Sequence, residues 1–204
     1  MNIVIFGLPG SGKDVQGNLL TKQHNLTVIS PGEIFRQEIK ANSPLGKKIK
    51  TIINSGGLLP DSTVAETVQK KIEKQKNETC FLFNGYPRTL QQAKLLHRQL
   101  ANQGKQVDLC IYLKVSPEEV MERLQGRKII KKRLDDDDSI VKRRILLYKS
   151  YCSEIIRYYD EQKKLVHING KKSIEEVNKD INQAISEYLT KKNNPCHTST
   201  LSMR

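Results

Sequence analysis

Tryptophan is missing from this chain of 204 residues, and aromatic residues together make up only 5% of it. Proteins that bind single strands by stacking need exposed aromatic side chains, so the composition offers little for such a platform. The net charge of +13 nevertheless favours an anionic partner, and nucleotide phosphates, nucleic acid and acidic lipid all qualify. Because the lysines are spread along the whole chain, most are expected to solvate the surface, and a basic nucleic-acid-binding protein is the alternative that charge alone leaves open.

The sequence also lacks closely spaced pairs of cysteines and long apolar runs. The four cysteines show no C-x-x-C spacing and the four histidines are scattered, so we expect neither a disulfide framework nor a zinc site. No apolar run approaches membrane-spanning length, and the first strand begins too near the N-terminus to leave room for a signal peptide. We therefore expect a cytoplasmic protein with no membrane partner.

What the chain does contain is an alternation of short apolar runs with helical patterns. The apolar runs predict five strands, at 2–6, 26–29, 80–83, 107–113 and 166–168. Helical patterns lie between and after them, at 15–20, from 31, from 44 to 54, and over 61–75, 90–103, 117–126, 138–162 and 173–189. This order predicts an α/β fold with a five-stranded parallel, doubly wound sheet that has helices on both faces.

Helix starts are marked by capping residues. Ser-x-x-Glu boxes begin at Ser30, Ser116 and Ser173, and each predicts a serine N-cap. Asp61 or its neighbour is expected to cap the helix that follows it, and Asp138 the long helix that ends near residue 162. Residues 191–204 are polar and have no periodic pattern, so we expect a disordered tail there.

Residues 7–13, with the sequence GLPGSGK, lie between the first strand and the first helix. Glycines let backbone N–H groups curl round an anion, and the helix N-terminus and Lys13 add positive charge. The stretch therefore predicts a phosphate-binding loop. The usual pattern has Ser or Thr directly after the lysine to hold magnesium, whereas Asp14 and Val15 follow here, and neither supplies a hydroxyl.

Ligands of doubly wound sheets bind beyond the carboxyl ends of the strands. The loops at 7–13, 30–36, 84–88 and 114–117 are therefore expected to face one crevice. Arginines suited to gripping phosphate occur in and after these loops, at positions 36, 88, 123, 127, 133 and 144. Phosphoryl transfer asks a protein mainly to position two anions and to neutralise developing charge, so the set predicts that chemistry.

These motifs resemble those of the adenylate kinases, within the nucleoside monophosphate kinases, over nearly all of residues 1–190. GLPGSGK is similar to the phosphate loop of that family, SPGEIFR at 30–36 to its S-T-G-D-x-x-R, and NGYPRT at 84–89 to its D-G-F-P-R-T. Only five residues separate Arg127 from Arg133, which resembles the short-lid forms. The resemblance implies a P-loop NTPase sheet with a helical flap at 30–60 that binds the acceptor and a short lid at 127–136.

The activity implied by the resemblance is reversible transfer of the ATP γ-phosphoryl to AMP, giving two ADP, with Mg²⁺ accompanying ATP and the chain acting as a monomer without a nucleic-acid partner. It assigns catalysis to Lys13, Arg88, Arg127, Arg133 and Arg144. It assigns ATP binding to Gly7, Pro9, Gly10, Ser11, Gly12, Lys13, Asp14, Val15, Arg123, Arg127 and Lys171. It assigns AMP binding to Pro31, Arg36, Leu58, Leu59, Gly85, Arg88, Gln92, Arg133 and Arg144, with Gln92 reading the adenine.

Four positions depart from the family pattern. Asp14-Val15 replaces Gly-Thr, Asn84 replaces an aspartate that orients magnesium-bound water, and Pro31 replaces a threonine. One hypothesis is that the carboxylate has moved across the site, so that Asp14 holds the Mg²⁺ that Asn84 cannot. The alternatives are a UMP- or CMP-type kinase, and a degenerate nucleotide-binding member with weak or no catalysis, in which Asp14 repels the triphosphate.

Overall fold

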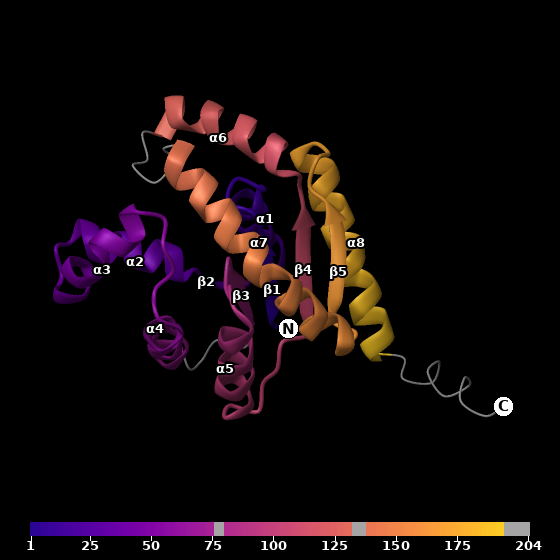
Figure 1. Cartoon of the computed structure of the whole chain (residues 1–204). Helices are drawn as coiled ribbons and strands as arrows, with labels where there is room; N and C mark the ends of the chain where they lie inside the picture. Colours follow the sequence, from indigo (N-terminus) through magenta and orange to yellow (C-terminus); the bar gives the residue numbers. More distant parts are fainter. Residues whose placement is uncertain (76–79, 132–137, 194–204) are drawn as a thin grey trace.

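A computed structural model describes residues 1–75, 80–131 and 138–193, without the side chains of 127–131 and 193. Its centre is a five-stranded sheet in the order β2-β3-β1-β4-β5, in which every pair of neighbours is parallel (Figure 1). The strands are β1 (Ile3–Gly7), β2 (Thr27–Ile29), β3 (Phe81–Asn84), β4 (Leu109–Lys114) and β5 (Leu165–Asn169). The predicted parallel, doubly wound sheet is therefore confirmed.

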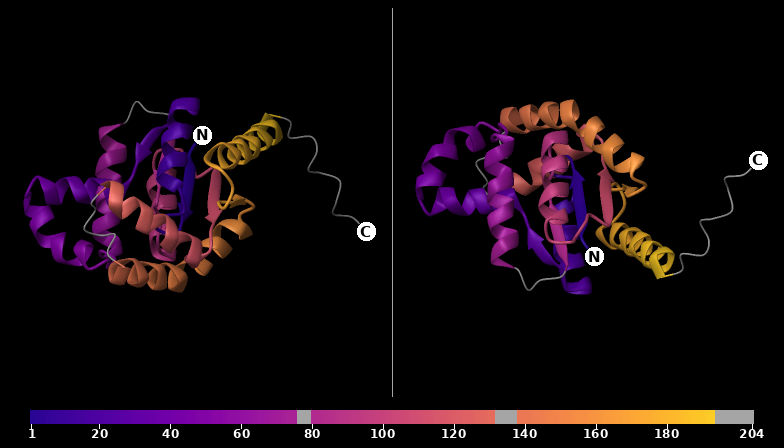
Figure 2. Two further views of the ribbon diagram at one scale, coloured as in Figure 1. Left: turned by 90° about the horizontal axis from the view of Figure 1, so that it is seen from above. Right: turned by 90° about the horizontal axis from the view of Figure 1, so that it is seen from below.

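Helices lie on both sides of this sheet, as Figure 2 shows from above and below. They are α1 (Lys13–His24), α2 (Pro31–Lys40), α3 (Pro44–Asn54), α4 (Asp61–Lys74), α5 (Leu90–Ala101), α6 (Pro117–Lys131), α7 (Asp138–Glu161) and α8 (Ile174–Asn193). The alternation of β1 side chains explains the layers. Ile3 and Ile5 pack with residues of α1 and α8, whereas Val4 and Phe6 pack with residues of α4, α5 and α7. Helices α2 and α3 project to one side (Figure 1).

Some predicted local details are confirmed and others are wrong. The hydroxyl of Ser116 accepts from the Glu119 N–H at 3.3 Å, and Ser173 caps α8 in the same way. Ser30 makes no side-chain cap bond, and α4 begins at Asp61 itself, whose side chain caps nothing. Helix α6 continues beyond residue 126 to 131, and α8 continues to 193, so the first residues of the expected tail are helical; 194–204 lie outside the described residues.

A buried carboxylate ties the start of the chain to its last helix. Asp108, only 5% exposed, accepts from the Asn2 backbone N–H at 2.7 Å and from the Tyr188 hydroxyl at 2.6 Å. Lys192 lies 3.4 Å from the same carboxylate. Burial raises the pKa of Asp108, but the hydrogen bonds from Tyr188 and Asn2 and the charge of Lys192 outweigh it and hold that pKa below its ordinary value.

Because the folded-state pKa of Asp108 is lowered, its contribution to stability is present above the unfolded-state value of about 3.9 and is lost as pH falls through the folded value. We expect Asp108→Asn to lower the free energy of unfolding by about 2 kcal/mol at pH 7, and the gap to the wild type to shrink below about pH 4. Urea unfolding at stepped pH measures this gap. Glu187→Gln, which neutralises an exposed carboxylate on α8 next to Tyr188, is the control, and a gap independent of pH would contradict the expectation.

Among the described helices, none combines the length and the apolar character that crossing a membrane requires.

Candidate active site

The loop between β1 and α1 has a backbone conformation that depends on its glycines. Gly10 and Gly12 have φ angles of 85° and 95°, in the left-handed region that favours glycine. A Cβ on Gly7 would lie 2.7 Å from the Ser11 Oγ and 2.8 Å from the carbonyl oxygen of Leu113, so this position also needs glycine. The loop thus packs against β4 and directs the N-terminus of α1 toward the crevice, as predicted from the sequence.

Four cationic side chains from separate elements reach one pocket beside this loop. They line it together with Asp14 and Asn84, and they are Lys13, Arg36, Arg88 and Arg144. The Arg88 Nε donates to the Gly85 carbonyl at 3.0 Å, which holds the start of the guanidinium in place. The guanidinium groups of Arg36 and Arg88 converge on the same space beside Gly32. A Cβ placed on Gly32 would lie 3.4 Å from an Arg88 Nη and 3.5 Å from an Arg36 Nη. Such a cluster suits phosphate groups.

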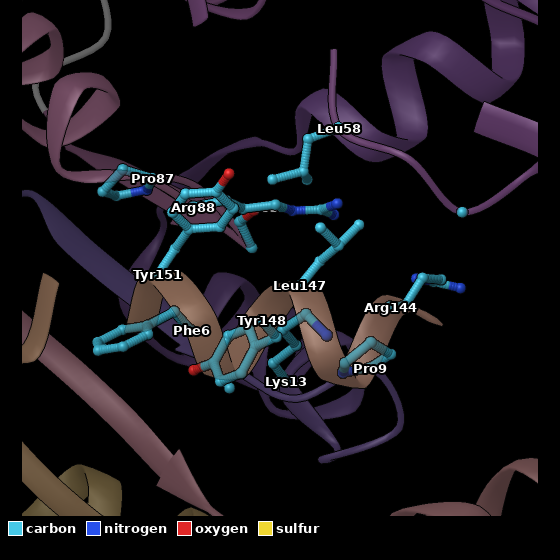
Figure 3. A pocket seen from close by; sticks show the side chains of 13 residues that line it. Phe6, Pro9, Lys13, Leu58, Pro87, Arg88, Arg144, Leu147, Tyr148 and Tyr151 are labelled. Carbon is cyan, nitrogen blue, oxygen red and sulfur yellow. Dashed lines mark hydrogen bonds between the residues drawn. The ribbon is translucent and has the colours of Figure 1, made fainter. Parts of the chain in front are cut away.

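A neighbouring cavity extends the site under α7 (Figure 3). Lys13, Arg88 and Arg144 lie around it, and most of the remaining lining is apolar or aromatic, from Phe6, Pro9, Leu58, Pro87, Leu147, Tyr148 and Tyr151. Leu58 belongs to the segment between α3 and α4, and a Cβ on Gly56 of that segment would lie 2.9 Å from the Ile140 Cγ2. The segment after α3 therefore packs against α7 and covers the cavity.

A second, mostly apolar pocket lies between α2, α3 and the start of α5. Its lining includes Pro31, Phe35, Ile53, Leu58, Leu59, Val64, Gly85, Tyr86, Arg88 and Gln92. Gln92 is only 1% exposed, and its Oε1 accepts from the Arg88 backbone N–H at 2.8 Å while its Nε2 donates to the Asp61 Oδ1 at 2.8 Å. Sequence reasoning missed this contact of Asp61, because it expected the side chain to cap α4. An apolar slot with one oriented amide suits a nucleobase.

Two of the residues that depart from the family pattern, Asp14 and Asn84, touch each other. The Asn84 Nδ2 donates to the Asp14 Oδ1 at 3.1 Å, although 70 positions separate the two residues. Asp14 is exposed at the start of α1, whereas Asn84 is buried at the end of β3. The Asn84 Oδ1 and the Ser11 Oγ are buried, and among the described residues neither finds a hydrogen-bond partner.

Three of the remaining predicted residues, Arg123, Lys171 and Val15, line neither the cationic pocket nor the two cavities beside it. Arg123 forms an ion pair with Glu119 at 2.9 Å on α6. Lys171 is exposed on the turn after β5, and this turn lies beside the phosphate loop, because a Cβ on Gly170 would be 3.5 Å from the Ser11 carbonyl oxygen. Val15 is 43% exposed. The side chain of Arg127 and the whole of Arg133 lie outside the described residues, so their predicted roles stay predictions.

The sheet order places the phosphate loop after β1, between β3 and β4, where the strand order reverses and such sheets bind ligands. This loop, the cationic pocket and the apolar pocket next to it define a P-loop nucleotide-binding protein with adjacent sites for two phosphate-bearing ligands.

Comparison with known proteins gives the family. The family model described as Adenylate kinase matches residues 5–164. An adenylate kinase of Bacteroides thetaiotaomicron is 36% identical over 187 residues, which cover 92% of this chain and 99% of the relative. An adenylate kinase of Azobacteroides pseudotrichonymphae is 37% identical over 189 residues, and one of Fervidobacterium nodosum 33% identical over 206. The chain belongs to the adenylate kinase family, as its motifs predicted.

Proposed function

We propose that this chain catalyses the reversible transfer of the γ-phosphoryl group of ATP to AMP, giving two ADP. The observation that carries the proposal is the single pocket that Lys13 of the phosphate loop shares with Arg36 and Arg88 from the other side and Arg144 from α7. Phosphoryl transfer needs two anions held side by side and their developing charge neutralised, and these four cations supply that.

Each part of the site takes one portion of the substrates. The loop amides and Lys13 hold the ATP phosphates, and Arg36 and Arg88 hold the AMP phosphate. The apolar pocket takes the AMP base against Gln92, with Pro31, Leu58, Leu59 and Gly85 among its walls. Arg144, with Arg127 and Arg133 of the proposed lid at 127–136, neutralises the transferring group, while Arg123 and Lys171 lie on the ATP-base side. The proposed flap at 30–60 contains α2 and α3.

Magnesium fits this site through one protein carboxylate. Among the described residues no three His, Cys, Asp or Glu side chains cluster closely enough to hold a metal ion. Mg²⁺ commonly needs only one or two carboxylates, because substrate phosphates and water fill its other positions. Asp14 would hold it together with ATP, and the Asn84 amide, which donates to Asp14, would orient that carboxylate. The ion, when bound, neutralises charge on the phosphates.

Location and assembly follow the same proposal. We infer a cytoplasmic protein that acts as a monomer; the free thiols of Cys110 and Cys152 fit a reducing compartment.

The test is an acceptor assay. The protein is incubated with ATP and Mg²⁺ plus AMP, UMP or CMP in separate reactions, and the diphosphates are quantified by chromatography. We expect rapid ADP formation with AMP only. Product mainly with UMP or CMP would move the chain to the other nucleoside monophosphate kinases, and ATP binding without product from any acceptor would mean a fold kept for binding.

A further inference from the structure

The carboxylate of Asp61 lies behind the proposed base pocket and joins α4 to α5. Its Oδ1 accepts from the Gln92 Nε2 at 2.8 Å, and its Oδ2 accepts from the Thr89 hydroxyl at 2.9 Å. The Thr89 hydroxyl in turn accepts from the Gln92 backbone N–H at 3.1 Å. Asp61 therefore fixes both the side chain of Gln92 and the first turn that carries it.

Two neighbours with opposite hydrogen-bonding character leave the Gln92 amide a single orientation. An ionised carboxylate only accepts, so the NH₂ group must face Asp61, and a backbone N–H only donates, so the oxygen must face Arg88. A flip of the amide would set two donors against each other and two acceptors against each other, and in a buried site each such mismatch is costly. The orientation of the amide is thus determined by its surroundings.

The fixed amide has one N–H and one lone pair on its oxygen left for a ligand in the pocket. The 6-amino group and N1 of adenine offer a donor and an acceptor, which complement that pair. A 6-oxo purine offers an acceptor and a donor in the reverse order, and would need the flipped amide. We propose that Asp61 is the positioning residue that, through Gln92, makes the acceptor site select 6-amino over 6-oxo purine nucleotides. This inference rests on the proposed function, since it takes the pocket as the AMP site.

The experiment compares the binding of AMP and IMP by calorimetry, without ATP or metal, so that the readout is independent of catalysis. We expect the wild type to prefer AMP by about a hundredfold, and Asp61→Ala to reduce the AMP-to-IMP ratio about tenfold, mainly by improving the relative binding of IMP. Thr89→Val is the matched control, because it also breaks a bond to Asp61 and loosens the start of α5 but leaves the Asp61–Gln92 contact. Its ratio should stay within about twofold of the wild type.

Each outcome separates the inference from the proposed function. If Gln92→Ala leaves AMP binding unchanged, the base does not occupy this pocket, and the acceptor assignment itself is wrong. If Gln92→Ala weakens AMP but Asp61→Ala and Thr89→Val give equal ratios, only the positioning role is overturned. The positioning role is also overturned if the wild type binds IMP within about threefold of AMP while AMP binding still depends on Gln92. This outcome can be measured without a folded Asp61 variant.

Discussion

Replacing Arg88 by alanine is expected to lower kcat/KM for AMP about a thousandfold. Arg88 lines the phosphate pocket, the covered cavity and the base pocket, and its fork converges with that of Arg36. Two hydrogen bonds to a charged phosphate would be lost, each contributing about 1.5–3 kcal/mol, and every 1.4 kcal/mol changes the rate about tenfold. Steady-state assays with varied AMP and saturating ATP measure the effect.

Two matched variants sharpen this test. Arg98→Ala makes the same change at an exposed position later on α5, and we expect it to keep activity within about twofold. Arg88→Lys keeps the charge but not the planar fork, so its activity should fall between those of the wild type and the alanine variant. Loss of activity in Arg88→Ala that appeared only as a higher KM for ATP would contradict the assignment of Arg88 to the acceptor phosphate.

The second large effect concerns the exchanged pair at the phosphate loop. Asp14→Asn is expected to lower the magnesium-dependent rate about thirtyfold, since the metal loses a charged ligand. The swap Asp14→Asn with Asn84→Asp returns one carboxylate to the same contact, whose atoms are 3.1 Å apart, and should restore the rate to within about fivefold of the wild type. A double-mutant cycle of rates, with Mn²⁺ binding in the presence of ATP measured by electron paramagnetic resonance, tests this coupling.

The competing hypothesis predicts the opposite sign. If Asp14 merely repels the triphosphate, Asp14→Asn should raise both ATP affinity and the rate, and Mn²⁺ binding should not weaken. Asp138→Asn, a first-turn change on α7, controls for the loss of a carboxylate at a helix start. It should leave Mn²⁺ binding unchanged.

Helix starts show why local patterns predict some contacts and not others. Ser116 and Ser173 cap their helices as predicted, because a capping box needs only residues within one turn. The same reasoning was wrong for Asp61, because its carboxylate is taken up by Thr89 and Gln92 on a different helix. The packing of α4 against α5 decided that competition, and no local pattern contains it.

The sequence by itself determined the alternation of strands and helices and the phosphate loop, because hydrophobic periodicity and glycine spacing act over a few neighbouring residues. It also identified the positions of the cations that share the pocket. Only the tertiary structure decided that Asp14 meets Asn84 across 70 positions and that Asp61 meets Gln92 across 31. Such contacts arise when separate elements pack on one sheet, so their partners and hydrogen-bond directions depend on the whole fold.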